Sequence, residues 1–288
     1  MPADRLPITV IIAARNEEDN LPNCLASVKK VTRVIVVDSH STDHSRRIVE
    51  EHGHEFVNFD YKGGYPKKRQ WALDQMGIET DWVMFLDADE QIPEVLWQEI
   101  EVALQADVNG YFVVKGFHFL GRKFRYGGFS HPAIILFRVG TGRFERLDEL
   151  DNGGLDMEIH ERLIVEGDCE SLANPLIHRD EHGLASYLSR HNQYSTWEAG
   201  IRYRFMQTGR WGEDAIRPRL FGDSQQRRRF IKRFIMQLPF EPQLWFFYHY
   251  VWRLGFLEGM PGYIASKIRA QYIRDARFKI WEIRNVSE

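Results

Sequence analysis

The sequence predicts an α/β fold with a mostly parallel sheet, and three observations support this prediction. Continuous apolar runs at residues 8–14, 34–37 and 82–86 are typical of strands that are buried on both faces. A helical pattern follows each of the first two runs. Polar residues gather directly after every run. Because the carboxyl ends of parallel strands meet at one edge of a sheet, we expect a binding site along that edge.

The first two strand-loop-helix units have the same design. Residues 8–14 end in the polar loop 15–20, and a helical pattern then begins at Leu21. Residues 34–37 end in the loop 38–43, before a helix that we expect over residues 45–52. The order β-α-β-α therefore brings two polar loops to the carboxyl edge of the sheet.

The third run ends in the acidic segment Asp87-Ala88-Asp89-Glu90. Removing unpaired carboxylates from water costs free energy, so a cluster of them at the end of a buried strand requires a positively charged partner. Clustered oxygen ligands suit a hard divalent cation such as Mg²⁺ or Mn²⁺. A solvated acidic turn is the alternative interpretation, because two aspartates at this spacing arise often by chance.

These three segments together resemble the family 2 glycosyltransferases with a GT-A fold. The matching residues occur in the order and at about the spacing of that family. Later segments are similar to the bacterial subgroup that builds lipopolysaccharide core and exopolysaccharide. The first set is Val10–Glu18, Val36–Asp43 and Phe85–Glu90, and the later set is Gln70–Leu73, His160–Leu163, Pro175–His178 and Gly255–Gly259.

The resemblance implies a Rossmann-like GT-A domain and a nucleotide-sugar donor at the carboxyl edge of its sheet. Asp38 can accept a hydrogen bond from a base N–H, which suits uracil, and Glu17 can accept hydrogen bonds from ribose hydroxyls. A cation of the run Lys67-Lys68-Arg69 could meet the base or the diphosphate, although for any one of the three we expect a solvated surface position. The family has Lys or Arg followed by Asn where this chain has Arg69-Gln70. The predicted donor-binding residues are Ala14, Arg15, Glu17, Asp38, Arg69, Asp87 and Ala88.

Catalysis by an inverting member of the family requires a base, and most members use a divalent cation. Asp89 is the expected direct metal ligand, with Asp87 reaching ribose or metal and His178 as a third ligand. By resemblance, Glu161 is the base that takes the proton of the acceptor hydroxyl, and Glu158 is the alternative. Two alternatives remain open. Glu161 could be an exposed carboxylate with no catalytic role, and His178 could be a buried structural histidine.

We divide the chain into a GT-A domain over residues 1–200 and a helical extension over residues 201–288. The extension holds 17 Lys and Arg against 8 Asp and Glu, whereas the first 200 residues hold 21 against 33. A basic, aromatic-rich segment fits docking on an anionic membrane surface, and a core helix with a solvated basic face is the alternative. Without a nucleic-acid-binding motif, we expect no nucleic acid partner.

The expected location is the cytoplasm, with peripheral docking on the inner face of the cytoplasmic membrane. Cys24 and Cys169 are far apart in the sequence, which favours a reducing compartment. The N-terminus lacks the apolar core of a signal peptide, and no run reaches the roughly 20 apolar residues that span a bilayer. The acceptor is expected to be a lipid-linked saccharide.

Three other classes of protein are compatible with parts of this pattern. A sugar-phosphate nucleotidyltransferase also uses a metal and paired aspartates, but the loop after the first strand lacks its glycines. A non-catalytic nucleotide-sugar-binding module would retain Asp38 and Asp89 and lack a base such as Glu161. A dehydrogenase is disfavoured because no G-x-G-x-x-G follows the first strand.

Overall fold

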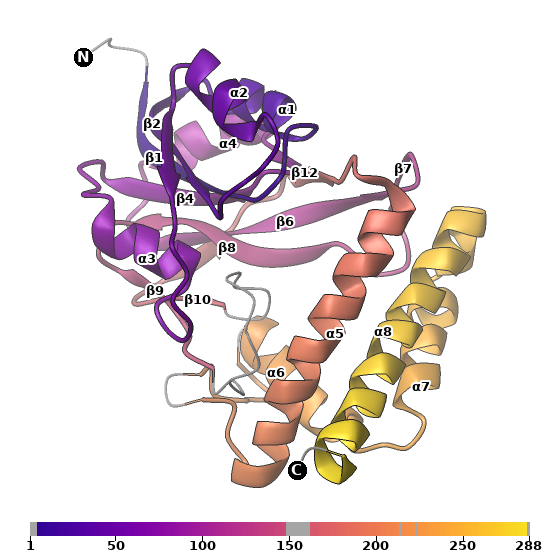
Figure 1. The fold of residues 1–288 in the computed structure, drawn as a ribbon. Helices are drawn as coiled ribbons and strands as arrows, with labels where there is room; N and C mark the ends of the chain where they lie inside the picture. Colours follow the sequence, from indigo (N-terminus) through magenta and orange to yellow (C-terminus); the bar gives the residue numbers. More distant parts are fainter. Residues whose placement is uncertain (1–4, 148–161, 213–214, 223, 287–288) are drawn as a thin grey trace. The chain divides into compact units, whose positions relative to one another are not determined.

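The structure is a computed structural model that describes residues 5–147, 162–212, 215–222 and 224–286, and the chain divides into two units (Figure 1). Unit 1 comprises residues 1–118, 130–144 and 156–181, and unit 2 comprises the remainder. The boundary that we placed at residue 200 lies inside a single helix, α5 (Gly183–Thr208). The structure assigns this helix to unit 2, because α5 packs along α8 (Gly259–Asn285).

Unit 1 is built on a sheet in the strand order β3-β2-β1-β4-β8-β6-β12-β5, with β11 beside β6. The pairings among β3, β2, β1 and β4 are parallel, as is that of β6 with β12, whereas β8 runs antiparallel to β4 and β6. The strands are β1 (Leu6–Ala14), β2 (Val31–Asp38), β3 (Glu55–Asn58), β4 (Trp82–Asp87), β5 (Glu90–Gln91), β6 (Gly110–Phe119), β8 (His131–Arg138), β9 (Gly142–Phe144), β10 (Leu163–Val165), β11 (Cys169–Ser171) and β12 (Leu176–Arg179).

Helices cover both faces of this sheet, which explains why its central strands are continuously apolar. On one face, Val10 and Ile12 of β1 pack with residues of α1 (Leu21–Ser27) and α4 (Glu94–Ala103). On the other face, Ile11 packs with Ala72 of α3 (Lys68–Gln75). Helix α2 (Ser45–Glu51) lies beside α1. The strand and helix predictions for the first ninety residues are therefore confirmed.

The register of the parallel strands brings the three polar loops to one edge. Ala14 pairs with Asp38, and Ala13 pairs with Asp87, so β1, β2 and β4 end at the same level. The predicted gathering of polar loops at the carboxyl edge of the sheet is thus present in unit 1.

Unit 2 is mainly helical and contains the short strand β7 (Arg122–Lys123). Its helices include α5, α6 (Ser224–Ile235), α7 (Glu241–Phe247) and α8, with a π-helical turn at Tyr248–Trp252 and a 3₁₀ turn at Gly255–Glu258. Both α5 and α7 pack on α8. Across the residues that the structure describes, none of the helices is long and apolar enough to span a bilayer.

A buried ion cluster joins the helices of unit 2. Arg202 of α5 donates to Glu198 at 2.5 Å and to both carboxylate oxygens of Glu241 of α7 at 2.8 and 2.9 Å. All three side chains are at most 2 % exposed. A buried charge whose partner is removed is strongly destabilising, so these helices depend on one another for neutralisation.

The three consecutive arginines at residues 227–229 differ in their exposure. Arg229 is buried, pairs with Glu145 and lies over the ring of Trp211. Arg227 and Arg228 are exposed. Only these two of the three cations are available to a surface partner.

We predict that Arg202→Met destabilises unit 2 by about 3–5 kcal/mol, because two buried carboxylates lose their shared cation. Arg204→Met makes the same chemical change at an exposed position of the same helix and should alter stability by less than about 0.5 kcal/mol. Urea unfolding followed by circular dichroism measures both changes. Equal effects of the two substitutions would contradict a special role for the buried cluster.

Candidate active site

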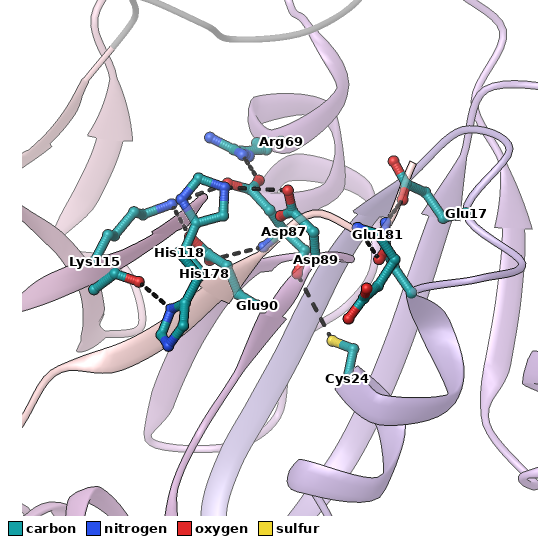
Figure 2. Close-up of polar contacts among 12 residues, drawn as sticks. Glu17, Cys24, Arg69, Asp87, Asp89, Glu90, Lys115, His118, His178 and Glu181 are labelled. Atoms are coloured by element: carbon teal, nitrogen blue, oxygen red, sulfur yellow. Dashed lines mark hydrogen bonds and ion pairs between the residues drawn. The ribbon is translucent and has the colours of Figure 1, made fainter. Parts of the chain in front are cut away.

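Two cations hold the first carboxylate of the acidic segment after β4 (Figure 2). Arg69 of α3 donates through Nη2 to Oδ1 of Asp87, and Lys115 of β6 donates through Nζ to Oδ2 at 2.9 Å. Burial disfavours ionisation of Asp87, but the two cations outweigh it and hold the pKa of this carboxyl well below its usual range. Asp87 is therefore a fixed anion with both oxygens engaged.

Glu90 closes the acidic turn from inside the protein. It is fully buried, accepts a hydrogen bond from the backbone N–H of Asp87 at 3.0 Å, and lies 2.6 Å from Nζ of Lys115. Burial is the largest influence on Glu90 and raises the pKa of its carboxyl. Burial opposes the charge of Lys115, but Asp87 and Glu90 outweigh it and raise the pKa of the lysine. Lys115 therefore stays charged between two carboxylates.

Asp89 and His178 form a separate pair at this edge. Oδ2 of Asp89 lies 3.1 Å from Nε2 of His178, and the antiparallel pairing of β12 with β5 sets His178 opposite Glu90. Their side chains are 18 % and 31 % exposed, so both remain accessible. Burial opposes protonation of His178, but the Asp89 carboxylate outweighs it and raises the pKa of the imidazole to about 9. The two residues, 89 positions apart in the sequence, are thus in contact, and their role as metal ligands stays a prediction.

This donor set fits a divalent cation in part. Among the described residues, no group of three or more His, Cys, Asp and Glu side chains is arranged as a metal site. Asp89 and His178 offer one oxygen and one nitrogen ligand, and Mg²⁺ or Mn²⁺ commonly completes its shell with water and phosphate oxygens. Because Arg69 and Lys115 engage Asp87, the ligand role that we assigned to Asp87 stays a prediction.

The loop after β1 contributes backbone groups to the same edge. The carbonyl oxygen of Ala14 accepts hydrogen bonds from Nζ of Lys68 at 2.9 Å and from the N–H of Ser39 at 3.1 Å. Arg15 is exposed. The Glu17 side chain accepts a hydrogen bond from Asn20 at 2.7 Å. Contacts of Ala14, Arg15 and Glu17 with a ligand remain predictions.

Asp38 is more deeply engaged than the sequence indicated. It is 1 % exposed, and its two oxygens accept hydrogen bonds from the backbone N–H and the hydroxyl of Ser41, at 2.7 and 2.5 Å. These bonds fix the loop after β2. Each carboxylate oxygen has a second lone pair, so recognition of a base by Asp38 is chemically compatible with this turn and remains a prediction.

The expectation that Lys67 and Lys68 are solvated is wrong. Both are buried, at 2 % and 1 % exposed, because α3 packs against β1 and Lys68 reaches the Ala14 carbonyl at the end of that strand. Together with Arg69, these lysines add positive charge at the carboxyl edge. Such charge suits a ligand that carries phosphates.

Sequence analysis missed Lys115, which links Asp87 to Glu90. The available signal was a cation that directly follows the apolar segment Tyr111–Val114. Ala88, between the two aspartates, is 3 % exposed. Glu158 and Glu161, our alternatives for a base, lie outside the described residues, so both assignments stay predictions.

Comparisons with known proteins agree with this fold. Residues 9–162, more than half of the chain, match the sequence family described as Glycosyl transferase family 2. "Lipopolysaccharide core biosynthesis glycosyltransferase LpsC" of Rhizobium meliloti is 25 % identical over 95 % of this chain and 96 % of the relative. An uncharacterized glycosyltransferase of Rickettsia conorii is 37 % identical over 33 % of this chain and 33 % of the relative.

A solved structure supports the predicted GT-A-like α/β fold. Mannosyltransferase PcManGT from Pyrobaculum calidifontis, solved in complex with GDP-Man and Mn²⁺, superimposes with a TM-score of 0.50. The superposition covers 97 % of this chain and 88 % of that chain, at 14 % sequence identity. At this identity the likeness concerns the fold alone.

We predict that Asp89→Asn weakens Mn²⁺ binding at least about tenfold, because an amide oxygen is a poorer ligand than a carboxylate oxygen. Asp81→Asn is the matched control, since Asp81 is exposed and precedes the other end of the same strand. Isothermal titration calorimetry with Mn²⁺ and a nucleoside diphosphate measures the change. Unaltered Mn²⁺ affinity in folded Asp89→Asn protein would exclude Asp89 as a ligand.

Proposed function

The chain belongs to glycosyl transferase family 2, and from this membership we propose a specific reaction for it. It transfers a sugar from a UDP-linked donor to a lipid-linked saccharide, with inversion and with the help of a divalent cation. The observation that carries the proposal is the carboxyl edge of unit 1, where Asp38, Asp87 and Asp89 gather in the segment that matches the family. Similarity to LpsC over almost the whole chain supports a role in lipopolysaccharide or other cell-surface polysaccharide biosynthesis.

The donor diphosphate fits the positive charge at this edge. Lys68 and Arg69 come from the start of α3, at the ends of β1 and β4. Asp87, held as an anion by Arg69 and Lys115, is suited to accept a hydrogen bond from a ribose hydroxyl. The arrangement therefore offers cations to the phosphates and an anion to the sugar of the nucleotide.

Asp89 and His178 are the residues that would hold the divalent cation. When bound, such a cation offsets the negative charge that develops on the departing nucleoside diphosphate. His178 would hold the cation through a neutral ring nitrogen, so metal binding would compete with the protonation of the imidazole that Asp89 favours. The protein's own contribution is to fix Asp89 beside His178 through the β12–β5 pairing.

The acceptor hydroxyl attacks the anomeric carbon from the side opposite the nucleoside diphosphate. The new bond joins the acceptor oxygen to that carbon, the bond to the diphosphate oxygen breaks, and Glu161 takes the hydroxyl proton. This single displacement inverts the anomeric configuration. Glu158 remains the alternative base.

A lipid-linked acceptor places the reaction at a membrane surface. We propose that the enzyme acts in the cytoplasm, on the inner face of the cytoplasmic membrane. The excess of cations over acids in residues 201–288 supports this, since anionic lipids attract basic segments.

Glu161→Gln should lower the rate of transfer by at least ~10²-fold, the lower range for a lost general base, while UDP affinity holds. Glu158→Gln is the matched control, because it makes the same change three residues away. Release of UDP in the presence of donor and acceptor measures the rate. An active Glu161→Gln variant beside an inactive Glu158→Gln variant would reassign the base to Glu158.

Nucleotide choice is tested by calorimetry with UDP and GDP in the presence of Mn²⁺. We expect tighter binding of UDP, because a carboxylate such as Asp38 can accept the N–H of uracil. Tighter binding of GDP would contradict the predicted base and leave the family unchanged. Absence of binding by either nucleotide would contradict the proposed donor class.

A further inference from the structure

Large apolar side chains crowd the surface of residues 240–263 in unit 2, a segment that we call the apolar face. It includes α7, the π-helical turn, the 3₁₀ turn and the first residues of α8. Trp252 is 73 % exposed and Met260 is 67 % exposed. Soluble proteins rarely expose so many apolar groups in one stretch unless the surface binds something. The exposed residues are Phe240, Leu244, Phe247, Tyr248, Val251, Trp252, Leu254, Phe256, Leu257, Met260 and Tyr263.

Ring contacts show that this face is continuous across its elements. The ring of Phe246 in α7 lies 5.2 Å from that of Tyr250 and 6.0 Å from that of Tyr263 in α8. Tyr250 in turn lies 6.3 Å from Phe256. Figure 1 shows α7 and α8 side by side, as their packing requires. These contacts link α7, the π-helical turn, the 3₁₀ turn and the start of α8, which are the elements that carry the exposed side chains.

The apolar face exposes no carboxylate. Residues 240–263, all of which the structure describes, contain only two acids, Glu241 and Glu258, and both are buried at 1–2 % exposed. Arg253 is exposed within the segment. Beyond it, Lys267 lies 4.8 Å from the ring centroid of Phe246, and the guanidinium of Arg269 lies 5.2 Å from that of Trp245. Aromatic groups with flanking cations are the composition of surfaces that bind anionic bilayers.

Hydrogen bonds from the loop 119–129 explain why Glu258 is buried. Its carboxylate accepts hydrogen bonds from Nε of Arg122 at 2.7 Å and from the backbone N–H groups of Arg125 and Tyr126 at 2.7 and 2.8 Å. Through Nδ1, His249 donates to the Gly127 carbonyl at 2.6 Å. These bonds attach the loop 119–129, which lies between β6 and β8 in the sequence, to the apolar face.

The elements to which this loop is attached pack closely through their backbones. A Cβ atom on Gly255 would lie 2.5 Å from the His249 carbonyl oxygen, and one on Gly262 would lie 2.0 Å from the Gly255 carbonyl oxygen. Burial lowers the pKa of His249 to about 4, so its ring stays neutral at physiological pH. Close backbone packing therefore fixes the 3₁₀ turn, which carries Glu258, against the π-helical turn and the start of α8.

We propose that the apolar face inserts its aromatic side chains into the surface of an anionic lipid bilayer and holds the loop 119–129 at that surface. The role of the loop in this inference rests on the proposed function, since at the membrane surface the loop would meet a lipid-linked acceptor. The occupant is lipid because the charge on the face and its flank is positive: Arg253 and Lys267 are exposed and Arg269 is partly exposed. Pairing with an apolar protein surface would leave these cations without anionic partners.

The test is co-sedimentation of the full-length protein with vesicles. Vesicles of phosphatidylglycerol and phosphatidylcholine should bind the wild type, and phosphatidylcholine alone should bind it more weakly. The double variant Trp252→Glu, Met260→Glu should bind at least about tenfold more weakly, because it places two carboxylates in the interface. Both side chains are highly exposed, so the fold should persist, as circular dichroism would verify.

Trp281→Glu is the matched control. Trp281 is 63 % exposed on α8 and lies about 30 Å along that helix from Met260 at 1.5 Å per residue. Its substitution should leave vesicle binding within about twofold of the wild type. Equal losses in the control and the double variant would overturn the location of the contact. Absence of binding to anionic vesicles, or a dimer that the double variant dissolves, would overturn the lipid as occupant.

Hydrogen exchange measured by mass spectrometry tests the role of the loop. Anionic vesicles should slow exchange in residues 240–263 and in the loop 119–129 of the wild type. In Glu258→Ala, protection of residues 240–263 should remain, whereas protection of the loop should be lost. Unchanged loop protection in this variant would overturn the attachment. These readouts need no turnover, so failure of the membrane inference is distinguishable from failure of the proposed reaction.

Discussion

Neutralisation of the carboxylates at and after the end of β4 is the constraint on which the site depends. Asp87 ends a strand that is covered on both faces, and Glu90, three residues later, is fully buried, so an unpaired charge there is costly. Lys115, from β6, contacts both of them, and Arg69, from α3, contacts Asp87. The acidic turn can fold in this position because α3 and β6 bring their cations to it. The same sheet then closes through β12, which pairs with both β6 and β5.

This constraint divides the acidic residues into two groups. Glu90 is fully buried beside Lys115, whereas the side chains of Asp87 and Asp89 are 31 % and 18 % exposed. Arg69 and Lys115 engage both oxygens of Asp87, and Asp89 faces His178. A cation that enters the site therefore meets Asp89 beside an imidazole, whereas Asp87 already has two cationic partners.

The sequence predicted what depends on local pattern. Apolar runs identified β1, β2 and β4, and their shared carboxyl edge followed from the parallel order. The contacts of Lys68 and Lys115 could not be predicted this way, because their partners come from elsewhere in the sequence. Lys68 reaches a carbonyl 54 residues away, and Lys115 reaches a carboxylate 28 residues away. The packing of α5 on the distant α8, in a helix that crosses the boundary expected at residue 200, could not be predicted from local pattern either.

In unit 2, buried carboxylates are also paired with cations or hydrogen-bond donors, and here the pairing determines the charge of the surface. Glu241 is neutralised by Arg202, and Glu258 is satisfied by the loop 119–129, so both acids are withdrawn from the surface. Their withdrawal leaves a face of aromatic groups with Arg253 as its exposed charge. Burial of two carboxylates thus does more than stabilise the helices, because it also sets the sign of the charge that the unit presents. An anionic partner then meets cations and apolar groups and no opposing carboxylate in residues 240–263.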